Sequence, residues 1–173
     1  MDDVTDVVFR QIIAEEGKPD VFFTEFVNVE ALCSPGRGVH GRRLEFTKDQ
    51  RPIVAQIWGK EPEHFREVSA ELVSMGFDGI DINMGCPDRT VVKNGLCSAL
   101  IEDHPRAAEI ITAVKEGVQI PSPTGGGLPA RTIPFARPDT CPFGQGSGGG
   151  RGGRLVPISV KTRIGIKKPV TED

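Results

Sequence analysis

Cys86 has surroundings that are unusual for a structural cysteine. It lies in the stretch DINMGCPDRTVVKNG, directly after an apolar run that is typical of a strand. Gly85 and Pro87 favour a turn there, and Arg89 and Lys93 follow closely enough in sequence to lower a thiol pKa. The alternative is a packed core thiol, because free cysteine is among the most buried residue types. The pattern favours a thiol lifted onto a loop, where it acts as an acid or a nucleophile.

Three further polar residues lie in or at the end of apolar runs. They are Gln56 in IVAQI, Asn83 in GIDINM and Lys161 in ISVKT. Lysine is rarely buried unless it is paired, so Lys161 in an apolar strand indicates a function. An amide side chain can both donate and accept hydrogen bonds. The pattern therefore favours a functional role over a purely structural one for these residues.

The residues that could do chemistry must be positioned by short strands that alternate with amphipathic helices. One predicted helix starts after a cap at Asp3, and its inward face is formed by Val4, Val7, Val8, Ile12 and Ile13. The helices are predicted at Val4–Glu16, Glu61–Met75 and His104–Glu116, and the strands at Asp20–Val27, Ile53–Ile57, Gly79–Met84 and Ile158–Thr162.

This alternation predicts an α/β fold with a parallel sheet and right-handed crossovers. It is compatible with a doubly wound sheet or with a (β/α)8 barrel. No GxGxxG follows a strand, which weakens the dinucleotide-binding form of the doubly wound sheet. The candidate residues lie in or just after strands, at the ends where barrels build their active sites. The sequence thus favours part of a (β/α)8 TIM barrel.

The segment 121–155 interrupts the pattern with 10 Gly and 6 Pro in 35 residues. Such a composition buries too little apolar surface to offset its ordering entropy. It predicts a disordered insertion, or an artefact of the reading frame, between 1–120 and 156–173. The boundaries place it in a loop from a helix to a strand, on the barrel face opposite the active site.

Bulk properties exclude few classes of function. The chain has 173 residues, a net charge of −3 and no run of 18 apolar residues, so no membrane span is expected. Its four cysteines are scattered, without the paired spacing of a structural metal site. We expect no metal, and a reducing, cytoplasmic setting.

Four segments, in order, resemble motifs of the tRNA-dihydrouridine synthases, flavoenzymes that reduce a uracil ring in transfer RNA. They are MDDVTDVVFR, QIWGKEPEHF, DINMGCPDRTVVKNGLCSALI and SVKTRIG, and the resemblance covers 1–119 and 156–173. It implies an FMN-binding barrel, here from the end of strand one to strand five, and a helical RNA-binding domain after it. It also implies NADPH as reductant, tRNA as partner and a monomer at full length.

The resemblance implies a role for each candidate residue. Hydride passes from reduced flavin to uracil C6, and Cys86 donates the proton to C5. The other roles are FMN binding by Met1, Gln56, Asn83 and Lys161, and contact with substrate or RNA by Arg89, Lys93 and Arg163.

Two alternatives stay open at this point. One is a flavin barrel that acts on free pyrimidines, of the dihydroorotate or dihydropyrimidine dehydrogenase type. The other is a truncated, non-catalytic fragment, because about 250 residues make a complete barrel. We expect this chain to be inactive by itself.

Overall fold

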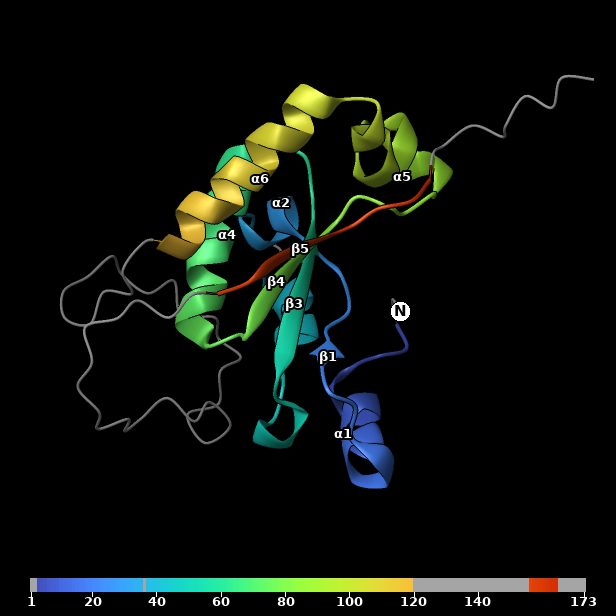
Figure 1. Cartoon of the computed structure of the whole chain (residues 1–173), viewed down its shortest axis with the longest axis vertical. Coiled ribbons are helices and arrows are strands. Elements are labelled where there is room, and N and C mark those ends of the chain that lie inside the picture. Colours follow the sequence, from blue (N-terminus) through green and yellow to red (C-terminus); the bar gives the residue numbers. More distant parts are fainter. Residues whose placement is uncertain (1–2, 36, 120–155, 165–173) are drawn as a thin grey trace, which may run out of the picture.

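Parallel strands form the centre of the molecule and alternate with helices along the chain (Figure 1). The computed structural model describes residues 3–35, 37–119 and 156–164. The sheet has the order β1-β3-β4-β5, with β2 also on β3, and every pairing is parallel. The strands are β1 (Phe22–Phe23), β2 (Val27–Asn28), β3 (Ile53–Trp58), β4 (Gly79–Asn83) and β5 (Ile158–Lys161). The predicted α/β class is confirmed, and this sheet is consistent with part of a barrel.

The helices of the described residues include the three expected from periodicity. They are α1 (Val7–Gly17), α4 (Pro62–Met75) and α6 (His104–Gln119). The sequence analysis did not anticipate the shorter ones, which are too short for a periodic pattern. These are α2 (Val29–Leu32), α3 (Arg37–Gly41), α5 (Arg89–Lys93) and the 3₁₀ turns η1 (Arg42–Leu44), η2 (Lys48–Gln50) and η3 (Cys97–Ile101).

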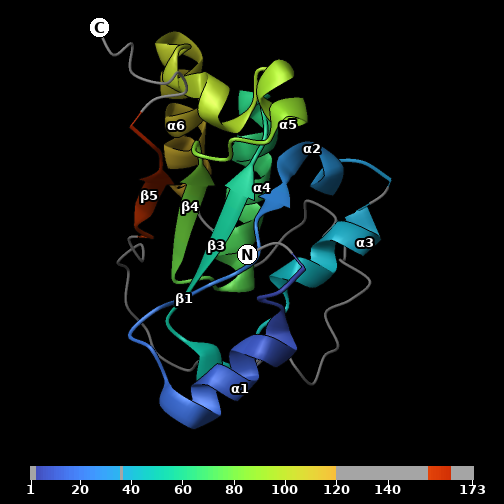
Figure 2. The same cartoon turned by 90° about the vertical axis from the view of Figure 1, so that its right-hand side faces the viewer.

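The long helices α4 and α6 pack together against one face of the sheet (Figures 1 and 2). Phe65, Val68 and Leu72 of α4 are buried, as their spacing predicted. Gly76 ends α4 in the left-handed conformation, at φ 86°, and donates its backbone N–H to carbonyls of the last turn. The strand β3 buries every second residue against these helices. Its alternate residues, Gln56 among them, therefore face the opposite side of the sheet.

The predicted strand Asp20–Val27 is divided into β1 and β2. After β1 the backbone N–H of Thr24 still donates to the carbonyl of Val54, at 3.0 Å. The backbone N–H of Gln56, however, donates to the side-chain Oγ1 of Thr24, at 3.0 Å. A hydroxyl therefore replaces a backbone acceptor, and the regular ladder is interrupted.

The start of α1 differs from the prediction. Asp6, and not Asp3, is the N-cap, and its Oδ1 accepts a hydrogen bond from the backbone N–H of Phe9 at 2.8 Å. The helix begins at Val7 for this reason.

The buried face of α1 was predicted correctly only in part, since Ile13 packs against the core as expected. Val8 and Ile12 are 62% and 54% exposed, whereas Arg10 is buried. The guanidinium of Arg10 donates to Gln50 Oε1 at 3.1 Å and to the backbone carbonyl of Glu45 at 2.5 Å. Because these acceptors come from distant segments, α1 is anchored by a polar residue that periodicity assigns to the surface.

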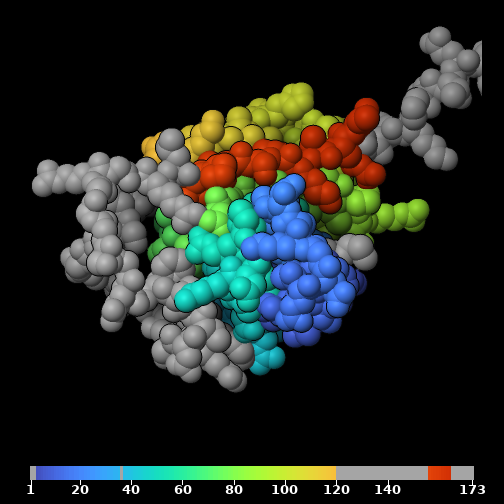
Figure 3. Space-filling model, turned by 60° about the horizontal axis from the view of Figure 1, so that its bottom comes forward, coloured from blue at the N-terminus to red at the C-terminus, as the bar shows by residue number. Residues whose placement is uncertain are grey.

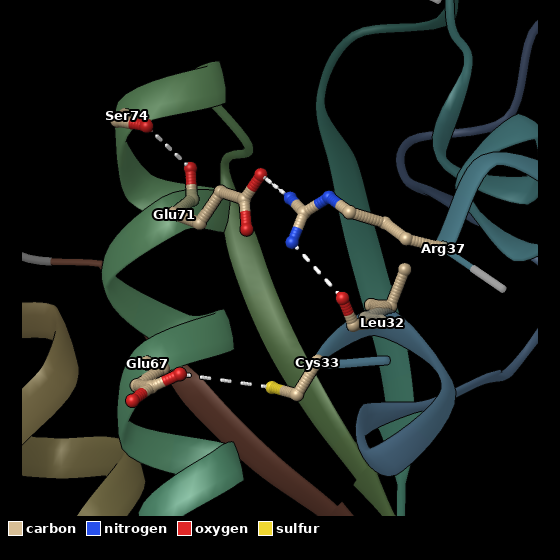
Figure 4. Close-up of polar contacts among 6 residues, drawn as sticks. All are labelled: Leu32, Cys33, Arg37, Glu67, Glu71 and Ser74. Atoms are coloured by element: carbon tan, nitrogen blue, oxygen red, sulfur yellow. Dashed lines mark hydrogen bonds and ion pairs between the residues drawn. The ribbon is translucent and has the colours of Figure 1, made fainter. Parts of the chain in front are cut away.

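A polar cluster ties α2 and α3 to α4 (Figure 4). Arg37 forms an ion pair with Glu71 and donates to the backbone carbonyl of Leu32 at 3.0 Å. The thiol of Cys33 donates to Glu67 Oε2 at 3.8 Å. Burial, together with the charge and hydrogen bond of Glu67, raises the pKa of Cys33 to about 11. This cluster holds the short helices against the helical layer.

The predicted insertion, 121–155, lies outside the described residues, so its boundaries stay a prediction. None of the described helices has the length and apolar character needed to cross a bilayer.

Candidate active site

The candidate residues meet at the carboxyl ends of β3, β4 and β5. In the parallel register, Gln56 pairs with Asp81, and Asn83 pairs with Lys161. Paired residues of neighbouring strands point to the same face, so these side chains share the face away from α4 and α6. Cys86 follows on the loop after β4, and Figure 2 shows α5 beyond this end of the strands.

Asn83 shapes the turn that carries Cys86. Its side chain is buried, and its Oδ1 accepts hydrogen bonds from the backbone N–H groups of Gly85 and Cys86, both at 3.1 Å. An asparagine side chain that accepts from the backbone two and three residues on holds the chain in a turn. The chain leaves the sheet at this point for that reason, and Cys86 is half-buried on the resulting loop.

Asp81 is a buried carboxylate in the middle of β4, and sequence reasoning missed it. Gln56 Nε2 donates to Asp81 Oδ2 at 2.7 Å, and Ser159 Oγ donates to Asp81 Oδ1 at 2.6 Å. Asn83 Nδ2 donates in turn to Gln56 Oε1 at 3.2 Å. The available signal was an acidic residue in the apolar run GIDIN, two positions from Asn83 and so on the same face.

A second cysteine lies close to the Cys86 loop. The backbone N–H of Ser98 donates to the carbonyl of Cys86 at 3.4 Å, and the adjacent Cys97 is buried with φ 50°. Burial, and next the nearby Cys86, raises the pKa of Cys97 to about 12. Cys97 is therefore an inert thiol at neutral pH, and Cys86 is the accessible member of the two.

The Cys86 loop also contacts the end of β5. The backbone N–H of Met84 donates to the carbonyl of Lys161 at 2.7 Å. A Cβ on Gly85 would lie 3.3 Å from the carbonyl group of Thr162. The close approach of the two backbones explains glycine at this position.

The exposure of Lys161 differs from the expectation. It was predicted to be buried in an apolar strand, but Lys161 and most of β5 are exposed. The reason is that β5 pairs with β4 on one side only, among the described strands, and Figure 3 shows β5 (red) at the surface. Lys161 belongs with the site residues because it pairs with Asn83 in the register of β4 and β5, and not because it is buried.

The basic candidates lie around this end of the sheet. Asp88 caps α5, and its Oδ1 accepts from the backbone N–H groups of Thr90 and Val91. Arg89 and Lys93 are exposed on α5 and, four residues apart, lie on the same side of it. Arg163 is exposed two residues beyond β5. Met1 lies outside the described residues.

This set of donors and acceptors fits the pyrimidine edge of a flavin. The carboxamide of Gln56 keeps one N–H and one oxygen lone pair beyond its hydrogen bonds to Asp81 and Asn83. Within the described part of the chain, the ammonium of Lys161 makes no hydrogen bond or ion pair. A cation and an amide on one face can bind a ring that presents carbonyl oxygens and an N–H. A thiol such as that of Cys86 can act as an acid beside such a ring.

Comparisons with known proteins agree on one family. The family described as dihydrouridine synthase (Dus) matches residues 1–124. A probable tRNA-dihydrouridine synthase of Staphylococcus aureus (strain COL) is 55% identical over 119 residues, which are 68% of this chain and 36% of that protein. The probable tRNA-dihydrouridine synthase 2 of Bacillus subtilis (strain 168) is 54% identical over 118 residues, again 68% and 36%. The chain therefore spans about a third of the length of these curated relatives.

Proposed function

The chain belongs to the dihydrouridine synthase family, and on this premise we propose that its site serves the reduction of uridine to 5,6-dihydrouridine in tRNA. The observation that carries the proposal is the turn at Cys86, which is held by a hydrogen bond to Asn83, while Asn83 is itself hydrogen-bonded to Gln56. The printed names of the relatives support the substrate. They favour tRNA over the free pyrimidines of the dihydroorotate and dihydropyrimidine dehydrogenases.

FMN is the cofactor in this proposal, and when bound it supplies the hydride for uracil C6. Gln56 and Lys161 bind its pyrimidine edge, Asn83 orients it or the substrate, and Met1 contacts the ring system. A cation at Lys161 stabilises negative charge on the bound ring. NADPH is the proposed reductant.

Cys86 completes the addition by giving its proton to uracil C5. The hydrogen bonds from Gly85 and Cys86 to Asn83 Oδ1 fix the backbone beneath the thiol, so the proton is held in one place when the substrate arrives. Cys97 cannot take over this role, because it is buried and its pKa is about 12.

Arg89, Lys93 and Arg163 are proposed to contact the phosphates of the RNA. The chain is acidic overall, at −3, so attraction to RNA depends on a local group of cations. The exposed positions of these three residues at one end of the sheet support that role. We place the activity in the cytoplasm and in a full-length monomer.

Because the chain spans about a third of the length of these relatives, the test uses a chimaera. The 119 aligned residues of the S. aureus relative are replaced by the matching residues of this chain, with 55% identity across the exchange. The purified chimaera, FMN, NADPH and an unmodified tRNA transcript should yield tRNA in which a uridine has gained two hydrogens, detected by mass spectrometry of nucleosides.

Cys86→Ala in the chimaera should abolish that product, and Cys97→Ala is the matched control that should retain it. The proposal fails if Cys86→Ala forms product at the parental rate. It also fails if the chimaera reduces free uracil or orotate and leaves tRNA unchanged, which is the result expected of a free-pyrimidine enzyme.

A further inference from the structure

The carboxylate of Asp81 has no role in the proposed chemistry, although it lies buried at 4% exposure beneath the site. Its two oxygens accept hydrogen bonds from Gln56 Nε2 and Ser159 Oγ. A buried carboxylate is costly unless its hydrogen bonds are satisfied, so its presence in a fully buried strand calls for a physical reason.

We propose that Asp81 is a positioning residue that, through the amide of Gln56, sets the orientation of Asn83 and thereby holds the Cys86 turn. The proposal rests on the proposed function only in naming Cys86 as the acid. Its structural content concerns a chain of hydrogen bonds that needs no cofactor.

The direction of this chain follows from the chemistry of its members. A carboxylate can only accept, so Gln56 must turn its NH₂ group toward Asp81. Its Oε1 then points to Asn83 and can only accept. Asn83 must therefore present Nδ2 to Gln56, and the structure has Asn83 Nδ2 at 3.2 Å from Gln56 Oε1.

The last member of the chain is the Cys86 turn. With Nδ2 of Asn83 turned to Gln56, its Oδ1 faces the backbone N–H groups of Gly85 and Cys86. If the Asn83 amide were reversed, N–H groups would face N–H groups, and two partly buried donors would lose their acceptor. The carboxylate of Asp81 thus decides an orientation at Asn83, with which it shares no hydrogen bond among the described contacts.

A charge exchange between the two positions tests this coupling. Asn83→Asp keeps an acceptor for the turn but presents a second carboxylate to Gln56, whose single NH₂ group cannot serve both. Adding Asp81→Asn should remove the conflict. The Gln56 amide then reverses, accepting from residue 81 and donating to residue 83, and Ser159 still has an oxygen to which it can donate.

The measurement is native-state amide exchange at Gly85 and Cys86 in the flavin-free 173-residue chain. Asn83→Asp should raise the exchange rates of Gly85 and Cys86 about tenfold over wild type, with amides of the strand interior as the reference. This factor corresponds to the loss of one ordinary hydrogen bond. The Asp81→Asn/Asn83→Asp double variant should return to within about twofold of wild type, the scatter of uncoupled substitutions. A Gln56→Leu background should remove this rescue, because the amide that links the two positions is then absent. Rescue that persisted there would come from direct repulsion between the two carboxylates.

The inference is overturned if the double variant exchanges as fast as Asn83→Asp, or if rescue persists without Gln56. Should Asn83→Asp fail to fold, a folded double variant with wild-type exchange supports the inference, and an unfolded one refutes it. Activity of the chimaera is read separately. Loss of the Cys86 role there would remove the proposed function and leave the exchange result standing.

Discussion

Gly117 lies where α6 packs against α4, and a substitution there tests the helical layer behind the site. A Cβ at this position would lie 2.8 Å from Ser69 Cβ and closer still to the backbone carbonyl oxygen of Arg66. Cβ atoms do not approach other atoms this closely in folded proteins, and the atom in the way on α4 belongs to the backbone. Gly117→Ala therefore requires the two helices to separate.

Two opposing effects set the size of the change. Alanine is favoured over glycine in a helix interior by about 1 kcal/mol. Overpacking a close contact costs typically about 1–3 kcal/mol and sometimes more. The upper part of that range applies because a helix backbone cannot rotate away as a side chain can. We expect Gly117→Ala to lower the free energy of unfolding by about 2 kcal/mol.

The assay is urea unfolding of the 173-residue chain, followed by circular dichroism. Gly38→Ala in α3 is the matched control, because a Cβ there meets no atom within 4 Å. The control should raise the free energy of unfolding by up to about 1 kcal/mol through helix propensity and reduced freedom of the unfolded chain. A Gly117→Ala variant as stable as wild type, or one no less stable than Gly38→Ala, would refute the reasoning.

Three further perturbations have defined outcomes. The pKa of Cys97 is raised to about 12 from 9.0, so the folded state binds more protons between these pH values, and stability should fall as pH rises through that window, by up to about 1.4 kcal/mol per pH unit. Cys97→Ala should flatten this dependence in urea titrations, and an unchanged slope would contradict it. Glu67→Gln should lower the pKa of Cys33, now about 11 mainly through burial and then through Glu67. Alkylation of Cys33 at pH 9.5 should become faster, and an equal rate would exclude the contact. Arg51→Lys should lower the free energy of unfolding by about 1–2 kcal/mol, the worth of one hydrogen bond to a charged group. Lysine cannot bridge both oxygens of Asp78, which Arg51 contacts at 2.7 and 3.1 Å. An unchanged thermal midpoint would contradict this expectation.

Local signals in the sequence determined much of the framework. The spacing of Phe65, Val68 and Leu72 and the glycine after Met75 defined α4, and the structure has this helix with its cap at Gly76. These features could be predicted because a helix and its caps depend on residues a few positions apart. The turn at Cys86 was predictable for the same reason, since Gly85 and Pro87 adjoin it.

Sequence patterns gave wrong predictions of burial where contacts with a distant segment determine whether a residue is exposed. Nothing near Arg10 in sequence indicates that it is buried, because its partner Gln50 lies 40 positions away. The exposure of Lys161 likewise follows from its place on a strand paired on one side within the described sheet. Apolar neighbours in sequence do not reveal which strand edge is covered.

The candidate site, too, was predictable from the sequence only in part. The types of Cys86, Asn83 and Gln56 were sufficient to identify them as candidates from sequence. Only the tertiary structure joined Gln56 to Asp81, 25 positions apart, and Asp81 to Ser159, 78 positions apart. The physical reason is that such hydrogen bonds depend on the register between parallel strands, and long crossovers separate those strands along the chain.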